Sequence, residues 1–173
     1  MLPGFREAAV LLPLLAGPGE EDPHLLFTVR QADLPTHAGQ IAFPGGKRDA
    51  ADRSPEETAL REAQEELGLD GDIEVLGLLD DVPTPAGFII TPVVGVLPRQ
   101  VELRPNRGEV AEVFSAPLSA LRRVHQAGPA REFLGVHYVM HEYPYRGWRI
   151  WGATAYMVQQ LLGLLDAEGA QQS

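Results

Sequence analysis

The chain has 173 residues, of which 45% are hydrophobic and 22% are charged, which is typical of one soluble domain with a real core. The formal net charge of −10 argues against a surface for nucleic acids or anionic membranes, and no stretch approaches the roughly 20 apolar residues of a membrane span. The absence of cysteine excludes disulfides, thiol nucleophiles and thiolate metal sites, and it agrees with a cytoplasmic location. We therefore expect a single domain over residues 1–173.

The first part of the chain predicts two strands and a long loop. The apolar run 8–15 indicates a buried strand, with a signal peptide as the alternative, and residues 17–23 indicate a turn. Residues 24–30 indicate a second strand. Residues 31–47 have no sustained period and predict a long ordered loop with a short strand near 40–43. Long loops in compact domains are often functional.

Residues 54–67 predict a helix with marked ends. Ser54 is a good N-cap, Pro55 suits the first helical position, and Glu57 has the spacing of a capping box. Gly68 fits just past the last turn. The sequence therefore sets the phase of this helix, and with it the face on which each side chain lies.

Three glutamates, Glu62, Glu65 and Glu66, project from one face of this helix. The roughly opposite face carries an apolar stripe that would pack on a core: Leu60, Ala63 and Leu67. Like charges at this spacing repel, and anions near a helix C-terminus oppose its dipole. Residues 49–72 hold nine acids against two bases. A hard divalent cation would relieve this repulsion, whereas the alternative is a solvated acidic face.

The middle of the chain predicts further strands. Residues 72–80 and 88–97 indicate strands joined by the turn-rich segment 81–87, and Pro92 places a break or a sheet edge in the second of them. Residues 109–114 indicate a strand or the entry to one.

The C-terminal part predicts a mixture of both element types. A short helix is expected at 117–126, and strands at 131–141 and 148–151 around a turn at 143–147. An amphipathic helix at 152–165 closes the chain. Strands interleaved with helices in irregular order predict an α/β or α+β sandwich.

A Gly-Gly turn at Gly45 and Gly46 precedes the acidic helix. Glycine lets the backbone approach a ligand closely, and its carbonyl can ligate a hard metal. The turn, an acid and then Arg-Glu-Ala-Gln-Glu-Glu-Leu-Gly-Leu at 61–69 resemble the signature of the Nudix hydrolases. Relative to that signature, the interval from Gly46 to Arg61 is one residue longer, and Asp52 stands where glutamate is usual.

The segment upstream is similar to the extra motif of the coenzyme A diphosphatase branch of that family. It comprises LLFTVR at 25–30 and HAGQIAFPGG at 37–46, with Pro35 where the motif usually has arginine. This replacement leaves two alternatives: either one contact of the motif is missing, or another cation of this segment supplies it, namely Arg30, Lys47 or Arg48.

The resemblance implies an α/β/α sandwich around a mixed sheet and Mg²⁺- or Mn²⁺-dependent hydrolysis of a diphosphate. For the coenzyme A branch, the products are 4′-phosphopantetheine, or its acyl form, and adenosine 3′,5′-bisphosphate. The alternatives are another nucleoside diphosphate derivative, such as ADP-ribose or NADH, and a nucleotide-binding domain without turnover. A calcium-binding structural module is disfavoured because the acids lie on a helix rather than in an EF-hand-type loop. The oligomeric state stays open.

The glutamates of the helix are the expected metal ligands. Glu62 and Glu66 would be the main ligands, Glu65 a further ligand or the group that orients water, and the Gly46 carbonyl would complete the site. Arg61 is expected to hold a carboxylate in position rather than contact substrate.

Carboxylates bound to a metal are poor general bases because the cation lowers their pKa. Glu109 and Glu112 are therefore candidates for the base, and the alternative is that they are surface residues. Phe88 is a candidate to line the substrate cleft. The other expected substrate contacts are Arg30, His37, Gly45, Lys47 and Arg48, although His37 could equally structure its loop.

Overall fold

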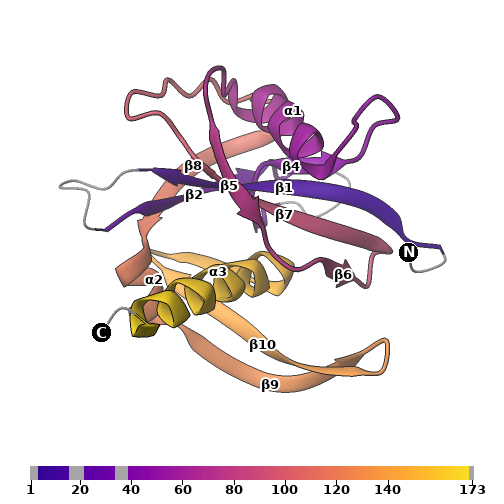
Figure 1. Ribbon diagram of the computed structural model, residues 1–173, viewed down its shortest axis with the longest axis vertical. Helices are drawn as coiled ribbons and strands as arrows, with labels where there is room; N and C mark the ends of the chain where they lie inside the picture. The colour runs from indigo at the N-terminus through magenta and orange to yellow at the C-terminus, as the bar shows by residue number, and fades with distance from the viewer. Residues whose placement is uncertain (1–3, 16–21, 34–38, 172–173) are drawn as a thin grey trace.

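The computed structural model describes residues 4–15, 22–33 and 39–171. Its main sheet has the order β3-β2-β1-β7-β5, and β4 pairs with β1, β6 with β7 and β8 with β2 (Figure 1). Eight strands within these ranges form it: β1 (Arg6–Leu15), β2 (His24–Arg30), β3 (Ile41–Ala42), β4 (Gly45–Lys47), β5 (Glu74–Leu78), β6 (Val82–Thr84), β7 (Phe88–Val96) and β8 (Val110–Pro117).

The sheet is mixed, as predicted. Strands β1 and β7 run parallel from Arg6↔Phe88 to Leu14↔Val96, and the other strand pairs are antiparallel. Figure 1 shows one helix above this sheet and the remaining elements below it. The helices are α1 (Pro55–Leu67), α2 (Leu118–Val124) and α3 (Gly152–Gln171), and a second sheet holds β9 (Gln126–Phe133), β10 (Val136–Tyr145) and β11 (Trp148–Trp151). The expected α/β/α sandwich is therefore confirmed.

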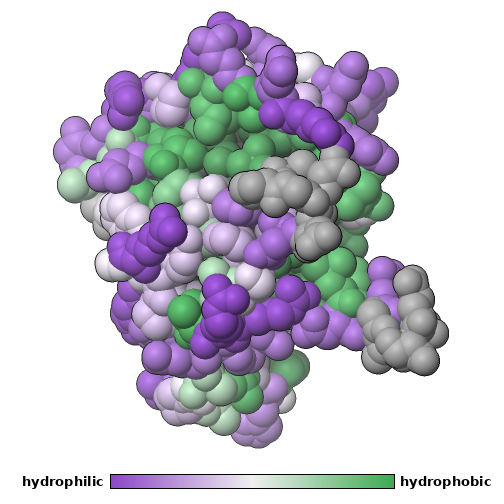
Figure 2. Space-filling view, turned by 90° about the vertical axis from the view of Figure 1, so that its left-hand side faces the viewer, coloured by the Kyte–Doolittle hydropathy of each residue, from purple (hydrophilic) through white to green (hydrophobic). Residues whose placement is uncertain are grey.

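Two apolar cores lie on the two faces of the main sheet. Alternation along β1 sends Ala9 and Leu11 to the core under α1, and Leu12 and Leu14 to the core shared with α2, α3 and the second sheet. Figure 2 shows apolar residues reaching the surface at the height of α1 and the sheet. In the described ranges, no helix is both long and apolar enough to cross a bilayer.

The Pro92 prediction is partly correct, because the proline sits inside β7 at a gap between two of its partners. Leu78 of β5 pairs with Val93, and Val82 of β6 pairs with Ile90. The Leu79 N–H donates to the Pro92 carbonyl at 2.9 Å, so the position that lacks an N–H faces this gap. Strand β7 therefore continues through Pro92, and the break falls between its partners β5 and β6.

Several boundaries were predicted wrongly. The hairpin turn lies at Leu134 and Gly135, inside the strand expected at 131–141, and the turn expected at 143–147 is largely strand. Leu134 has a φ of 54°, a conformation that leucine rarely adopts, so the sequence carries only Gly135 as a turn signal. Strand β6 occupies part of the turn expected at 81–87, and β4 ends the loop expected at 31–47. The predicted turn at 17–23 lies largely outside the described residues.

Candidate active site

Helix α1 is held in place at both ends and along one face. The Ser54 hydroxyl accepts from the Glu57 N–H at 3.3 Å, and Gly68, with a φ of 62°, donates its N–H to the Gln64 carbonyl at 2.8 Å. Ala63 and Leu67 are fully buried in the core below the helix. Because this apolar stripe faces the sheet, the acidic side chains next to it are held at the margin of the sheet.

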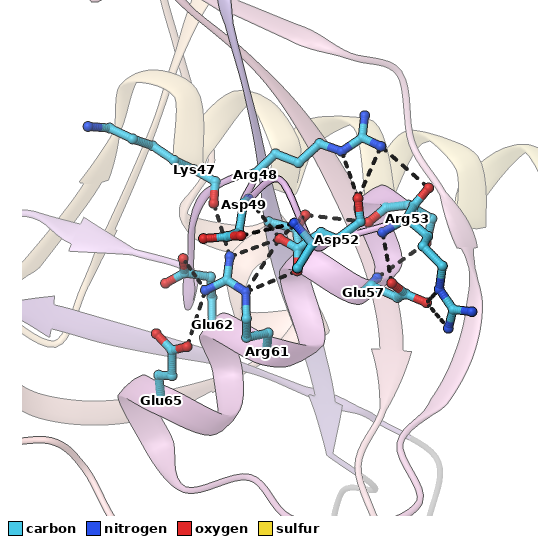
Figure 3. Close-up of polar contacts among 12 residues, drawn as sticks. Lys47, Arg48, Asp49, Asp52, Arg53, Glu57, Arg61, Glu62 and Glu65 are labelled. Carbon is cyan, nitrogen blue, oxygen red and sulfur yellow. Dashed lines mark hydrogen bonds and ion pairs between the residues drawn. The ribbon is translucent and has the colours of Figure 1, made fainter.

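Arg61 is the centre of an ion network at this margin (Figure 3). Its Nη2 donates to Asp52 Oδ2 at 3.0 Å, and its Nη1 donates to Glu62 Oε1 at 2.9 Å and to Glu65 Oε1 at 3.2 Å. It also donates to the Lys47 carbonyl at 3.1 Å, which links the helix to β4. Arg61 therefore touches the carboxylates it was expected to hold.

Asp52 is a buried carboxylate that accepts hydrogen bonds from three directions. Besides Arg61, the Asp49 N–H and the Thr58 hydroxyl each donate to its Oδ2 at 2.9 Å. These donors, Arg61 first, hold the pKa of Asp52 far below its ordinary value. Sequence reasoning left the role of this residue open, and the structure places it as the anchor of Arg61.

Glu66 is buried with little to neutralise it. It is 5% exposed, and its pKa rises to about 8, first because of burial and then because of the charges on Glu62 and Glu109. The backbone of Gly45 and the charge of Arg30 oppose the rise without cancelling it. Burial also raises the pKa of Glu62, although Arg61 opposes that shift. This part of the site holds more negative charge than the surrounding residues neutralise.

The two glycines before the helix let β4 pack closely against two neighbours, α1 and β1. A Cβ on Gly46 would lie 2.5 Å from Glu62 Oε1, and a Cβ on Gly45 would lie 2.5 Å from the Ala9 carbonyl of β1. Glycine at Gly46 thus lets the backbone of β4 lie directly against a glutamate of the helix. The Gly46 carbonyl belongs to β4, the same short strand whose Lys47 carbonyl accepts from Arg61.

The loop before β8 delivers Glu109 to these glutamates. The Asn106 N–H donates to the Glu66 carbonyl at 2.8 Å, and the Asn106 carbonyl accepts from Glu109 and Val110 at 3.0 and 2.8 Å. Glu109 is close enough to raise the pKa of both Glu62 and Glu66. Asn106 was not identified from the sequence, where Asn-Arg-Gly signals only a turn.

The remaining candidates are spread around this centre. Glu112 lies on β8 opposite Val29 of β2, whereas Glu109 is the candidate whose charge acts on Glu62 and Glu66. Arg30 ends β2, and its Nε is buried without a hydrogen-bond partner within the described ranges. Arg48 is engaged by Glu7 at 2.7 Å and by the Asp52 carbonyl at 3.2 Å. His37 lies outside the described residues, as does Pro35.

The donor chemistry of this centre fits a hard divalent cation. Carboxylate and backbone carbonyl oxygens are its preferred ligands, and the charge that Glu66 carries when ionised is only partly offset by Arg30. In the part of the chain that the structure describes, no three acidic or histidine side chains yet converge closely enough to hold a metal ion. Arg61 instead engages Glu62 and Glu65, so these two side chains would have to rotate toward Glu66 to share an ion with it.

The known proteins that resemble this chain in sequence and in fold are Nudix proteins. A model described as the NUDIX domain matches residues 5–135. The chain is 45% identical over 160 residues to the uncharacterized Nudix hydrolase NudL of Pectobacterium atrosepticum, covering 90% of this chain and 81% of that protein. Among solved structures, the M. smegmatis Nudix hydrolase RenU has a TM-score of 0.57 at 28% identity, with 68% of this chain and 74% of that chain covered. A mutT/nudix family protein from Listeria innocua has a TM-score of 0.62 over 96% of this chain and 97% of that one, and its 17% identity shows the fold alone.

Proposed function

Because the chain belongs to the Nudix hydrolase family, we propose that it is a divalent-metal-dependent hydrolase of the diphosphate bond in coenzyme A and its derivatives. Water would cleave the bond to give 4′-phosphopantetheine, or its acyl form, and adenosine 3′,5′-bisphosphate. The observation that carries the chemistry is the group of Glu62, Glu66 and Glu109. Burial, with the charges of Glu62 and Glu109, raises the pKa of Glu66 to about 8, and burial also raises the pKa of Glu62. The choice of substrate depends on the upstream residues 25–30 and 37–46, which are similar to the coenzyme A branch.

Glu62, Glu65, Glu66 and the Gly46 carbonyl are the groups that would hold Mg²⁺ or Mn²⁺. Such an ion, when bound, would neutralise the diphosphate and lower the pKa of the attacking water. The close approach of Gly46 to Glu62 supports this set, because it places the backbone of β4 directly against a carboxylate of α1. The anionic substrate cannot approach this acidic face favourably unless its charge is offset.

Arg61 would act by positioning these ligands rather than by touching substrate. Its guanidinium is already held by Asp52 and by the Lys47 carbonyl, so Glu62 and Glu65 meet a fixed partner. The Glu65 side chain is 57% exposed, and it would turn toward the substrate or toward water by leaving its 3.2 Å contact with Arg61. We assign it as a further ligand or as the group that orients the attacking water.

Glu109 is the better placed candidate for the general base. It enters the glutamate group from another element, the loop before β8, and so need not serve as a metal ligand. Glu112, the other candidate, lies three residues farther along the chain, on β8 opposite Val29 of β2. A carboxylate that is free of metal retains the basicity needed to accept a proton from water.

Cations and backbone donors around β4 would bind the substrate. Among the described residues the buried Nε of Arg30 has no hydrogen-bond partner, and the charge of Arg30 acts on Glu66, so this donor suits a phosphate oxygen once the acidic charge is offset. Lys47 is exposed, and the N–H of Gly45 lies near Glu66. Arg48 and His37 complete the proposed set, Arg48 through the loop that it braces.

A substrate panel tests this function. Purified protein would be assayed with Mg²⁺ or Mn²⁺ against coenzyme A, ADP-ribose, NADH and nucleoside triphosphates, with separation of the products by chromatography. We expect the highest kcat/KM for coenzyme A or an acyl derivative. Equal or faster turnover of ADP-ribose or NADH would overturn the coenzyme A assignment, and no turnover of any diphosphate would indicate a nucleotide-binding domain.

A further inference from the structure

Strands β1 and β4 carry cations on both of their faces, and the two faces differ. On the face toward α1, Glu7 of β1 pairs with Arg48 at 2.7 Å, so that charge is neutralised. On the opposite face lie Arg6 and Lys47, whose strand positions pair with Phe88 and Ala8 respectively. Within the described ranges, neither Arg6 nor Lys47 forms an ion pair with an acid. A chain with a net charge of −10 thus keeps two exposed cations unneutralised at one place.

The aromatic ring of Phe88 lies close to both of these cations. The Arg6 guanidinium carbon lies 4.1 Å from the centroid of the Phe88 ring, and Lys47 Nζ lies 5.9 Å from it. Both distances suit a cation–π contact, which offsets part of the repulsion between the two positive charges. The Arg6 N–H also donates to the Gly87 carbonyl at 2.9 Å, which fixes the start of β1 beside Phe88. The two cations are therefore held at one strand end before any ligand arrives.

This cluster adjoins the proposed metal site without being part of it. Lys47 directly follows Gly46, and its carbonyl is held by Arg61 at 3.1 Å, yet its side chain points away from Arg61 and the glutamates (Figure 3). In the described part of the chain, β4 pairs with β1 alone, so its other edge is free of strand partners. We therefore expect a nucleotide whose diphosphate lies at the glutamates to extend past that edge toward Arg6 and Lys47.

We propose that Arg6 and Lys47, gathered by Phe88, bind a phosphate monoester on the nucleotide half of the substrate, which in coenzyme A is the 3′-phosphate of the ribose. Arginine and lysine are suited to a terminal phosphate because they offer a planar fork and a point charge. The inference rests on the proposed function in naming coenzyme A, but the binding of the phosphate monoester itself is independent of turnover. The cluster makes the enzyme selective for 3′-phosphorylated over unphosphorylated adenosine diphosphate derivatives.

Kinetics with coenzyme A and dephospho-coenzyme A, which lacks the 3′-phosphate, provide the first test. We expect Arg6→Gln to lower the ratio of the two kcat/KM values by about tenfold, through KM rather than kcat, and Arg6→Gln/Lys47→Gln to lower it further. Arg6→Lys should retain part of the ratio. Arg122→Gln removes one positive charge at α2, far from this strand end, and should leave the ratio unchanged. An unchanged ratio in the double variant would overturn the proposal.

Binding measurements separate this proposal from the proposed function. Calorimetry would compare adenosine 3′,5′-bisphosphate with adenosine 5′-monophosphate on the wild type and on Arg6→Gln/Lys47→Gln. We expect the wild type to bind the bisphosphate more tightly, and the double variant to lose that preference. This result would support the subsite even if coenzyme A proved not to be hydrolysed. Equal affinities in the wild type would overturn the subsite even if coenzyme A were hydrolysed.

Discussion

Asp52 and Glu66 are two buried carboxylates, one before helix α1 and one in its last turn. Their pKa values are shifted in opposite directions. Asp52 is 8% exposed and Glu66 5%, so burial does not distinguish them. Asp52 accepts hydrogen bonds from Arg61, Thr58 and the backbone, and its pKa is strongly lowered. Glu66 faces two other carboxylates, and its pKa is raised to about 8.

The difference separates a structural half of the site from a reactive half. Around Asp52 each charge has a partner within the protein, so the loop and the helix are locked together. Around Glu66 the nearby positive charge does not offset the effect of burial and of the other carboxylates, and a bound cation would supply what is missing. We therefore expect substitutions at the two carboxylates to act on different properties.

Glu66→Gln should give the largest effect on activity. It removes a proposed metal ligand while keeping the size of the side chain, so we expect kcat to fall by about a thousandfold, which corresponds to about 4 kcal/mol of transition-state stabilisation. Steady-state assays with circular dichroism would measure activity and folding together. Glu56→Gln, the same change in the first turn of α1, is the matched control and should keep its activity. Turnover of Glu66→Gln within tenfold of the wild type would refute the reactive role of this half.

Asp52→Asn should act mainly on stability. The amide cannot neutralise Arg61, and the loop that it anchors through Thr58 and Asp49 would loosen, so we expect the thermal midpoint to fall by several degrees. Thermal unfolding would measure this, with the exposed Asp49→Asn as the control for the same change in the same loop. A variant as stable as the wild type would show that Asp52 does not anchor Arg61.

The sequence predicted α1 well because its signals are local. Ser54, Pro55 and Gly68 each act within one turn, and the apolar stripe sets the face toward the sheet. The hairpin at Leu134 was missed because its turn uses a leucine at positive φ, which tertiary structure imposes rather than local preference.

The site was predictable only as far as one helix face. Spacing placed Glu62, Glu65 and Glu66 together, but it could not rank their burial, because burial depends on segments distant in sequence, such as the Asn106 loop that binds the Glu66 carbonyl. The approach of Glu109 has the same origin, because hydrogen bonds over about 40 residues of sequence separation bring it there. Asp52 was equally hidden, because the fixed role of Arg61 appears only when the loop is folded against the helix.

The pH dependence of metal-free stability sharpens the contrast between the two carboxylates. The folded protein holds a proton on Glu66 up to about pH 8, whereas the unfolded chain releases it near 4.5, so this group lowers stability as the pH rises between these values. We expect the wild type in EDTA to lose several degrees more of thermal midpoint from pH 5 to pH 8 than Glu66→Gln does. Added Mg²⁺ or Mn²⁺ should reverse the wild-type loss. Parallel plots of thermal midpoint against pH for the two proteins would show that folding does not raise the pKa of Glu66.

Gly46→Ala is the mildest change we expect to register, and it probes the boundary between the two halves. The new Cβ would lie 2.5–2.7 Å from the Glu62 carboxyl atoms, which form the movable end of a side chain rather than backbone. The carboxylate would therefore shift toward Arg61, at the expense of the group around Glu66, and we expect kcat to fall by about tenfold with little loss of stability. Gly163→Ala in α3, whose Cβ would meet nothing within 4 Å, is the control and should keep full activity. If Gly46→Ala instead unfolded the protein and left the kcat of the folded fraction intact, the close approach of β4 to α1 would serve packing, and Glu62 would belong with Asp52 in the structural half.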